Sequence, residues 1–179
     1  WAYSAPPCKL NSRGLGELTV ALTFYGVPLG MALVAGGQVS PALAWASVSQ
    51  ALLITALLYV NQFPDRRADA LAGKRHWVVR LPLAGAVAGH ALLLAAAYGW
   101  LALGLGLGRL PLAAALGLFT LPLSLRAALQ LGRHADTPSR LRPAIIATLL
   151  AANLHPVCLA VGLAHAAYFT EIGRASCRE

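Results

Sequence analysis

Five apolar runs divide this chain, and each approaches or exceeds the roughly 20 residues that an α-helix needs to cross a bilayer. The runs cover residues 16–37, 41–60, 82–104, 110–129 and 144–169. Of the 179 residues, 58% are hydrophobic and only 11% are charged, whereas a soluble domain carries about 25% charged residues. The sequence therefore predicts an all-α fold, a multi-pass transmembrane bundle of five membrane helices.

The links between the runs predict how these helices begin and end. The short, uncharged link at 36–41 favours a tight connection, so the first two helices should be neighbours. Pro64 cannot donate a helical backbone hydrogen bond, so the second helix should kink or end near Gln62. Pro122 and Arg126 shorten the apolar core of the fourth run, which makes it the weakest of the five.

Three glycines alternate with leucine before the fourth run. They are Gly104, Gly106 and Gly108. A dinucleotide-binding fingerprint needs a strand before it and a helix after it, whereas a membrane helix is predicted before these glycines. They predict a flexible turn at the outer membrane interface.

Basic residues gather in the links that should face one side of the membrane. The net charge is +8, but the charges do not line one soluble face as in a nucleic-acid-binding domain. Excess Lys and Arg mark the cytoplasmic side, and the two opposite links carry only Arg109 between them. The predicted partner is therefore the lipid bilayer and not a nucleic acid. The basic residues assigned to the cytoplasmic side are Lys9, Arg13, Arg66, Arg67, Lys74, Arg75, Arg80, Arg126, Arg133, Arg140 and Arg142.

Residues 61–75 place two carboxylates, an amide and a cationic cluster at the membrane edge. If helical geometry resumes after Pro64, then Asn61, Asp65 and Asp69 drift only about 40° per step around the helix axis. All three side chains could then point into one cavity. Paired carboxylates hold Mg²⁺ while leaving positions open for phosphate oxygens, and nearby Lys and Arg bind phosphate charge. The segment predicts a cytoplasmic site for a metal-bridged anion.

A second interpretation of this segment stays open from its residues alone. Solvated cytoplasmic loops commonly carry acidic and basic side chains that pair with one another and bind no ligand. Arg75, taken by itself, could simply face lipid headgroups at a helix end. His76 and Trp77, which follow the cationic cluster, are expected at the membrane surface.

Several polar side chains fall inside the predicted membrane helices, where polar groups usually face the bundle interior. They are His90, Asn153, His155 and His165. For Asn153 and His155 we favour hydrogen bonds between helices, with the lining of a ligand cavity as the alternative. Trp45 and Trp100 are interpreted as packing residues or interface anchors.

Two sets of short motifs follow one another along the chain. The first set is Tyr3-Ser-Ala-Pro-Pro7 with Arg13-Gly-Leu-Gly-Glu17. The second set is Asn61-x-x-x-Asp65-x-x-x-Asp69 with Gly73-Lys74-Arg75 and Val78-Val79-Arg80-Leu81. In these motifs the chain resembles the UbiA superfamily of membrane prenyltransferases. Within the superfamily it is most similar to the 1,4-dihydroxy-2-naphthoate polyprenyltransferases of menaquinone synthesis, and the likeness covers almost all of residues 1–170.

The resemblance implies a bundle of nine transmembrane helices with two Asp-rich motifs that face each other across a central cavity. Residues 1–170 would be the C-terminal part of a single prenyltransferase membrane domain, with helices five to nine and the second motif. Such a part is expected to be inactive alone. Residues 171–179 resemble a translated sequencing adapter and are expected to lie outside the domain.

The resemblance also implies roles for the residues of the site. Asp65 and Asp69 are expected to be catalytic and to bind Mg²⁺ on the substrate diphosphate, with Asn61 as a supporting metal ligand. The residues expected to contact the diphosphate are Lys74, Arg75 and Arg80. The chain departs from the family's pattern at Arg66, where an aromatic or aliphatic residue is frequent, and at Pro82, where Gly is usual.

The activity implied is transfer of an isoprenyl group from a prenyl diphosphate to an aromatic acceptor, with Mg²⁺ as cofactor, at the inner or plasma membrane. The expected acceptor is 1,4-dihydroxy-2-naphthoate, and another acceptor such as 4-hydroxybenzoate is the alternative. A membrane transporter or a structural membrane subunit is a further alternative. The apolar runs give little support to a transporter, since they lack the charge pairs at mid-membrane depth that ion-coupled carriers commonly need.

Overall fold

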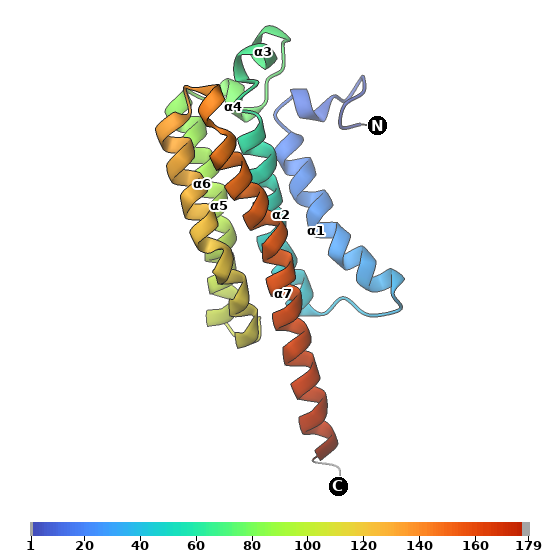
Figure 1. Ribbon diagram of the computed structural model, residues 1–179. Coiled ribbons are helices and arrows are strands. Elements are labelled where there is room, and N and C mark those ends of the chain that lie inside the picture. The colour runs from blue at the N-terminus through green and yellow to red at the C-terminus, as the bar shows by residue number, and fades with distance from the viewer. Residues whose placement is uncertain (1, 177–179) are drawn as a thin grey trace.

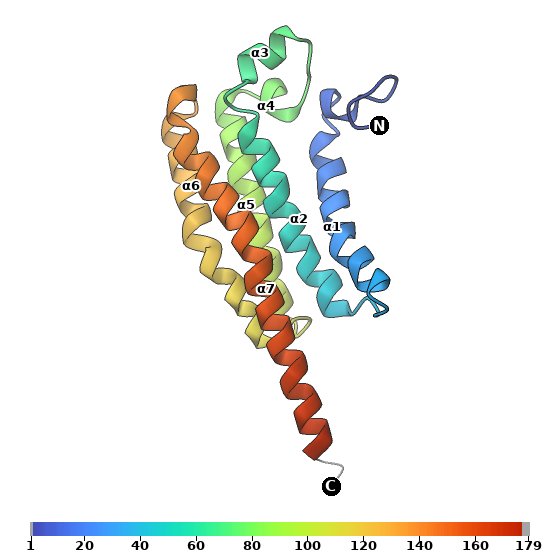
Figure 2. The same cartoon turned by 45° about the vertical axis from the view of Figure 1, so that its right-hand side comes forward.

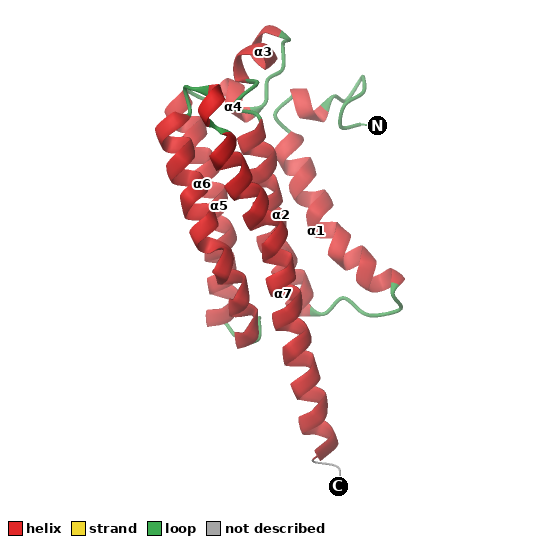
Figure 3. Ribbon diagram, in the orientation of Figure 1, coloured by secondary structure: helices red, strands yellow, loops and turns green. Residues whose placement is uncertain are grey.

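The computed structural model describes residues 2–176, and the side chains of residues 2–169. Over that range it consists of helices and connecting loops, with no β-strand (Figure 1 and Figure 3). The long elements are α1 (Gly16–Val34), α2 (Pro41–Asn61), α5 (Leu83–Gly106), α6 (Leu121–His134) and α7 (Arg142–Ser176), with the 3-10 helix η2 (Leu112–Thr120) before α6. The short elements are η1 (Leu10–Ser12), α3 (Arg66–Leu71), α4 (Trp77–Arg80) and η3 (Pro138–Arg140).

Within the described residues, five helical segments are long and apolar enough to cross a membrane. They cover Gly16–Val34, Pro41–Asn61, Leu83–Gly106, Leu112–His134 and Arg142–Phe169. These bounds lie close to the five apolar runs of the sequence. The prediction of an all-α bundle with five membrane helices is confirmed.

Helix α2 begins and ends where the sequence predicts. The Ser40 hydroxyl accepts a hydrogen bond from the Leu43 backbone N–H at 3.1 Å, and Pro41 occupies the first turn, where its missing N–H is tolerated. At the other end, the helix stops at Asn61 with Gln62 as its cap. The stop follows from the proline two residues beyond the cap, which disfavours helical geometry before it.

The fourth membrane segment is not one regular helix. Its first part is the 3-10 helix η2, and α6 begins at Leu121. Pro122 lies in the first turn of α6, the part of a helix where proline fits best. Ser124, Ala127 and Leu131 are the buried residues of α6 and lie on one face. Arg126, also within this segment, is exposed.

The predicted turn at the three alternating glycines is partly wrong. Helix α5 continues through Gly106, and only Gly108, with φ 65°, lies in the turn that follows. Gly104 is buried, and a Cβ atom there would overlap the Trp45 indole. Trp45 stacks on Trp100 with ring centroids 4.4 Å apart, and each indole N–H donates to the other residue's carbonyl. These two residues pack α2 against α5.

Helix α2 packs against α1, α5 and α7, and α1 stands to one side with α2 as its main contact (Figure 1 and Figure 2). The prediction that the first two helices are neighbours is confirmed. On the other side, η2 approaches α7 closely at Gly162, where a Cβ atom would overlap the Ala113 backbone. Small residues commonly allow such close packing between membrane helices.

A buried polar network joins α2, α5, η2, α6 and α7. The His155 ring bonds with the Ser49 hydroxyl at 2.9 Å and with the Thr120 hydroxyl at 3.1 Å. The Tyr98 hydroxyl bonds with Thr120 at 2.9 Å and with Ser124 at 2.8 Å. Because buried polar groups need hydrogen-bond partners, the network accounts for a histidine inside an apolar bundle. The favoured prediction for His155 is confirmed.

The other polar residues of the membrane segments behave differently. Asn153 is exposed and donates to the Leu149 carbonyl of its own helix at 2.8 Å, so the prediction of an interhelical hydrogen bond is wrong for this residue. His90 is buried, and its ring lies 3.4 Å from the Thr148 hydroxyl on α7. His165 is exposed and packs against Phe169.

The long helices alternate in direction, so the links gather at two ends (Figure 1). The N-terminal segment, the 62–82 link and the 135–141 link lie at one end, which we call the cationic end because the basic links meet there. Arg109 lies in the link at the opposite end. Of the proposed adapter tail, residues 171–179, the structure describes only the backbone of 171–176, which continues α7. The assignment of residues 1–170 to one part of a nine-helix domain stays a prediction.

Candidate functional site

The candidate site lies in the link between α2 and α5, at the cationic end of the bundle (Figure 1). After the turn that contains Pro64, helical geometry resumes with Asp65 as the residue before α3. The Asp69 backbone N–H donates to the Asp65 carbonyl at 2.8 Å. Because this bond spans one helical turn, the two carboxylates leave from the same side of α3. The predicted register of the two acids is confirmed.

Asn61 does not share this register. It is the last residue of α2, its side chain is exposed, and the turn around Pro64 separates it from α3. The expectation of one continuous helical face through all three residues is therefore wrong for Asn61. Its role as a supporting metal ligand stays a prediction.

Asp69 is held by two neighbours. Its Oδ1 accepts a hydrogen bond from Lys74 Nζ at 2.7 Å, and its Oδ2 lies 3.0 Å from His76 Nε2. Burial acts to raise the pKa of Asp69, but the hydrogen bonds from Lys74 and His76 outweigh it and hold the pKa below its usual value. The stability from this pairing is present above the pKa of an unfolded aspartate and is lost as the pH falls through the folded pKa.

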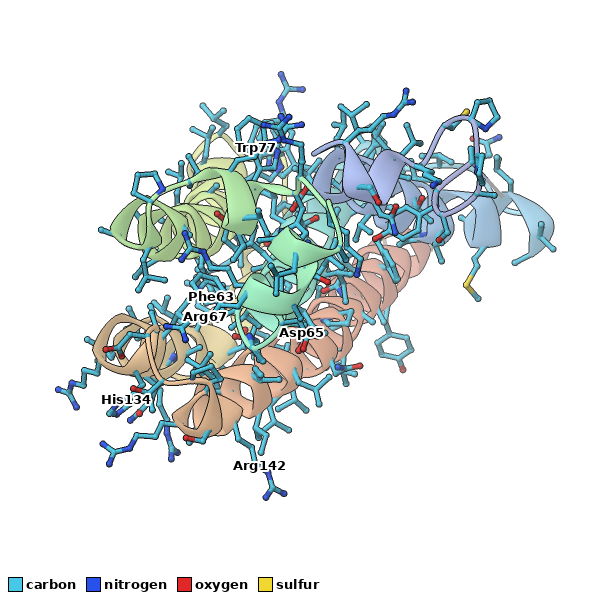
Figure 4. All side chains as sticks on the ribbon, turned by 90° about the horizontal axis from the view of Figure 1, so that it is seen from above. Phe63, Asp65, Arg67, Trp77, His134 and Arg142 are labelled. Atoms are coloured by element: carbon cyan, nitrogen blue, oxygen red, sulfur yellow. The ribbon has the colours of Figure 1, made fainter. Side chains whose placement is uncertain are left out.

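Asp65 is exposed, and its carboxylate makes no hydrogen bond to a described residue. The pKa of Lys74 is raised, mainly by its hydrogen bond to Asp69 and to a smaller extent by the negative charge of Asp65. Both acids therefore favour the charged form of the same ammonium group. Figure 4 places Asp65 toward the middle of the cationic end, with Trp77, His134 and Arg142 nearer its edge. Neither acid lines the two cavities of about 110 and 440 Å³ next to the link.

Arg66, one of the departures from the family's pattern, fastens α4 to the start of α3. Its Nε donates to the Val78 carbonyl at 2.7 Å, and its guanidinium also donates to the Leu81 carbonyl at 2.9 Å. Val78 is fully buried, so these bonds attach the link to the core. Pro82, the other departure, is the cap residue of α5, where its fixed backbone fits.

The N-terminal segment lies against the same link. The Arg75 backbone N–H donates to the Ser12 carbonyl at 2.9 Å, and the Arg80 guanidinium donates to the Arg13 carbonyl at 2.8 Å. Gly14 has φ 79°, and a Cβ atom there would lie 3.2 Å from the Arg80 side chain. The two sets of motifs, which are far apart in the sequence, therefore meet in space.

The three cations of the predicted site differ in how free they are. Lys74 is bound to Asp69, as described above. Arg80 donates to Arg13 and lies 5.8 Å from the centre of the Trp77 ring, which leaves further guanidinium N–H groups for a ligand. The Arg75 side chain is exposed and bonds to no described residue. Two arginines at this end therefore keep donors that could bind an anion.

The donor set fits Mg²⁺ in its chemistry. Among the described residues, no three His, Cys, Asp or Glu side chains gather as a metal-binding group. Mg²⁺ does not need such a group, since it keeps several waters and is usually bound by one or two carboxylates with substrate phosphates. Two acids on one side of α3 suit that arrangement. Because both Asp69 oxygens are engaged, a metal ion at Asp69 requires the bond to Lys74 or His76 to open.

The sequence did not identify all residues of this region. His76 is 3% exposed and bonds with Asp69, a contact that the sequence did not predict. Its place at the membrane surface stays a prediction. Glu17 lies in the first turn of α1, as a carboxylate favours, but its side chain is only 8% exposed. The sequence signal available for Glu17 was its position at the end of the Arg13-Gly-Leu-Gly-Glu17 motif. No pattern in the sequence marked Tyr59, which lies beside it.

Comparisons with known proteins agree with these observations. A model of the UbiA prenyltransferase family matches residues 1–154. The chain is also similar to UbiA prenyltransferase domain-containing protein 1 of Dictyostelium discoideum, with 37% identity over 73 residues, which are 40% of this chain and 22% of that protein. The chain thus aligns with about a fifth of this relative's length. No solved structure matches the chain significantly.

The family match covers both sets of motifs, the α2–α5 link and four of the five membrane segments completely, with the start of the fifth. It extends over most of the chain. This protein therefore belongs to the UbiA prenyltransferase family.

Proposed function

We propose that the full-length protein transfers an isoprenyl group from a prenyl diphosphate to 1,4-dihydroxy-2-naphthoate, as a step of menaquinone biosynthesis. Family membership supports membrane prenyl transfer in general and weighs against a transporter or a purely structural subunit. The choice of acceptor rests on the motifs of residues 3–17 and 61–81. The alternative acceptor is 4-hydroxybenzoate.

One observation carries the proposal more than any other. Asp65 and Asp69 stand one helical turn apart on the same side of α3, inside a basic link at one end of a membrane bundle. A solvated loop whose charged side chains only pair with one another does not require its two acids to lie on the same side of a helix. Two acids in this arrangement, with cations around them, suit a diphosphate bridged by a divalent metal.

In this proposal the residues of the link divide the work of holding the diphosphate. Asp65 and Asp69 would hold Mg²⁺, which when bound would offset the negative charge of the leaving diphosphate. Arg75 and Arg80 donate to the phosphate oxygens, as arginine does readily. Lys74 joins them once its bond to Asp69 opens. Cations already in place stabilise the charge that develops as the allylic C–O bond breaks.

The acceptor then completes the reaction. An electron-rich ring carbon forms a bond with C1 of the prenyl group, and diphosphate leaves with the electron pair of the C–O bond. With 1,4-dihydroxy-2-naphthoate, the same ring carbon loses its carboxylate as carbon dioxide. Tyr59 and Val60 of α2 and Phe63 and Val78 of the link belong to one buried apolar cluster, and such apolar surroundings limit access of water to a reactive allylic cation.

The proposal places the cationic end in the cytoplasm. Basic links meet at this end, and excess Lys and Arg mark the cytoplasmic side of a membrane protein. Prenyl diphosphates are charged and water-soluble at the head, so a site on this face receives the diphosphate from the cytoplasm while the prenyl tail stays in apolar surroundings. The protein would lie in the inner or plasma membrane.

The activity can be tested with the full-length protein in membranes. A prenyl diphosphate is supplied with either 1,4-dihydroxy-2-naphthoate or 4-hydroxybenzoate, and prenylated products are measured by mass spectrometry. We expect product with the naphthoate, its loss on chelation of divalent cations, and recovery on addition of Mg²⁺. Product with 4-hydroxybenzoate alone would overturn the choice of acceptor. Failure of a folded preparation to bind prenyl diphosphate would overturn the activity itself.

A further inference from the structure

A groove runs between α6 and α7, which pack against each other along their length (Figure 1 and Figure 2). Its volume is about 280 Å³, close to the lower end of the range for small-molecule sites, about 300–1,000 Å³. The groove can therefore hold a small group, or one part of a larger molecule. Its lining combines two arginines with an apolar floor.

The apolar floor comes mainly from α7. Pro143, Ile146 and Leu150 line the groove, and their spacing places them on one face of the helix. Ile146 is 41% exposed and Leu150 is 44% exposed, so the packing of α6 against α7 leaves this face open. Leu123 adds to the floor from α6. Because the floor lies within two membrane-length segments, an acyl chain is the apolar group that a bilayer offers to it.

The two arginines enter the groove from different helices. Arg142 is the first residue of α7 and projects outward at the edge of the cationic end (Figure 4). Arg126 lies on α6, eight residues before the last residue of that helix, His134, which is about 12 Å along the helix axis at 1.5 Å per residue. An arginine at that depth can lay its apolar stem along the helix and direct its charge toward the headgroups.

Neither arginine has a partner of opposite charge. In the part of the chain that the structure describes, neither guanidinium forms a hydrogen bond or an ion pair. No Asp or Glu lines the groove, whereas the two cavities lined by Arg67 or Arg133 both include Asp136. An unpaired charge inside a membrane segment is costly. The groove therefore indicates an anionic ligand from outside the described residues.

The bilayer itself offers such an anion. An anionic phospholipid carries its phosphate at the headgroup level, and arginine binds phosphate oxygens through several N–H groups at once. Basic pockets between membrane helices bind anionic headgroups in this way. We propose that the groove binds one anionic phospholipid, with its phosphate between Arg126 and Arg142 and one acyl chain along Ile146 and Leu150.

This lipid site is separate from the candidate diphosphate site. The groove shares no lining residue with the α2–α5 link that carries Asp65 and Asp69, so the inference does not depend on the proposed function. A lipid held by both arginines would connect α6 with the start of α7. Because a ligand that binds only the folded state stabilises it, the bound lipid should also raise the melting temperature.

The test compares two lipids with the same acyl chains. Full-length protein is purified in detergent and freed of lipid, and its affinities for dioleoylphosphatidylglycerol and dioleoylphosphatidylcholine are measured by native mass spectrometry. Only the first lipid carries a net negative charge, and we expect the unaltered protein to bind it more tightly. Arg126→Gln and Arg142→Gln should each weaken binding of phosphatidylglycerol by about 5-fold, the contribution of one basic residue to an anionic lipid. Both should leave binding of phosphatidylcholine nearly unchanged.

Two further variants distinguish a built site from general attraction. Arg140→Gln is the matched control, because Arg140 is exposed at the same end but does not line the groove, and it should retain the affinity of the unaltered protein. Ile146→Trp keeps both arginines but fills the groove, and should weaken binding of both lipids. Equal affinity of the two lipids for the unaltered protein would overturn the proposal. Equal weakening by Arg140→Gln, or full affinity in Ile146→Trp, would overturn it as well.

A soluble phosphate is tested as the alternative ligand. Glycerol phosphate carries the same charged group without acyl chains, and we expect it not to displace phosphatidylglycerol. Displacement would assign the groove to a soluble phosphate and overturn the lipid assignment. Thermal unfolding, followed by circular dichroism, verifies that the variants are folded. Phosphatidylglycerol should raise the melting temperature of the unaltered protein more than that of Arg126→Gln or Arg142→Gln, and an equal rise in all three would contradict the site.

Discussion

His155 and His165 lie ten residues apart on α7 and have opposite surroundings. The His155 ring is fully buried, bonds with Ser49 and Thr120, and lies edge-on to Tyr98 with ring centroids 5.7 Å apart. His165 lies exposed beside Phe169. Both are histidines in one apolar run, so only the packing of neighbouring helices decides which of them stabilises the bundle.

Replacement of His155 by leucine should destabilise the protein, because Ser49 and Thr120 each lose a buried partner. We expect the free energy of unfolding in detergent to fall by about 1–3 kcal/mol. His165→Leu is the matched control on the same helix and should change it by no more than about 0.5 kcal/mol. Equal effects of the two substitutions would show that the network does not stabilise the bundle.

The two acids and His76 show how far single residues can be predicted here. The spacing of Asp65 and Asp69 predicts their shared register, because four residues make about one helical turn. Asn61 was wrongly placed on the same face, since Pro64 ends α2 before that turn can form. The contact between His76 and Asp69 was not predictable, because it depends on how the loop after α3 folds back, and no periodicity encodes that path.

Helix positions and ends that depend on hydrophobicity and on local residues such as proline could be predicted from the sequence. Features that depend on packing against neighbouring helices could not. The ends of α2 follow from Ser40, Pro41 and Pro64. The 3-10 start of the fourth segment and the continuation of α5 through Gly104 depend on neighbours. The buried surface of Gly104 receives the Trp45 indole, so a glycine that resembles a turn signal in the sequence is a packing site in the helix.

Gly104→Ala should disturb the contact between α2 and α5, since the added methyl group overlaps the Trp45 indole. We expect a loss of about 1–3 kcal/mol in the free energy of unfolding, as in overpacked cores. Gly106→Ala is the control two residues further along α5, where an added Cβ meets nothing within 4 Å. It should be neutral or slightly stabilising, because alanine favours a helix more than glycine does. Thermal unfolding of both variants, followed by circular dichroism, checks this.

The distribution of charge over the entire bundle argues for one orientation in the membrane. Basic links meet at the end that carries the two acids, and the opposite end has Arg109 in its link. Excess positive charge stays on the cytoplasmic side during insertion. The same end therefore combines the orientation signal with the proposed diphosphate site.

This orientation can be checked by labelling single cysteines in a protein whose own cysteines have been replaced. Gln38→Cys lies in the exposed link between α1 and α2, and Ala72→Cys lies in the exposed link after α3. In intact cells a membrane-impermeant maleimide should label position 38 readily. Position 72 should react only after permeabilisation. The reverse pattern would place the acids outside the cytoplasm.

The most direct measurement compares prenyl transfer by Asp65→Asn, Asp69→Asn and Asp136→Asn variants of the full-length protein. Asp136 is an exposed acid at the same end, it pairs only with the neighbouring Thr137 among the residues that the structure describes, and it serves as the control. We predict that the first two substitutions lower turnover by at least about 100-fold, the size of effect seen when transition-state charge stabilisation is removed. Membrane insertion should be unaffected, and Asp136→Asn should retain turnover within about 2-fold of the unaltered protein. Wild-type turnover in either Asp65→Asn or Asp69→Asn would contradict the role of this pair in holding the diphosphate.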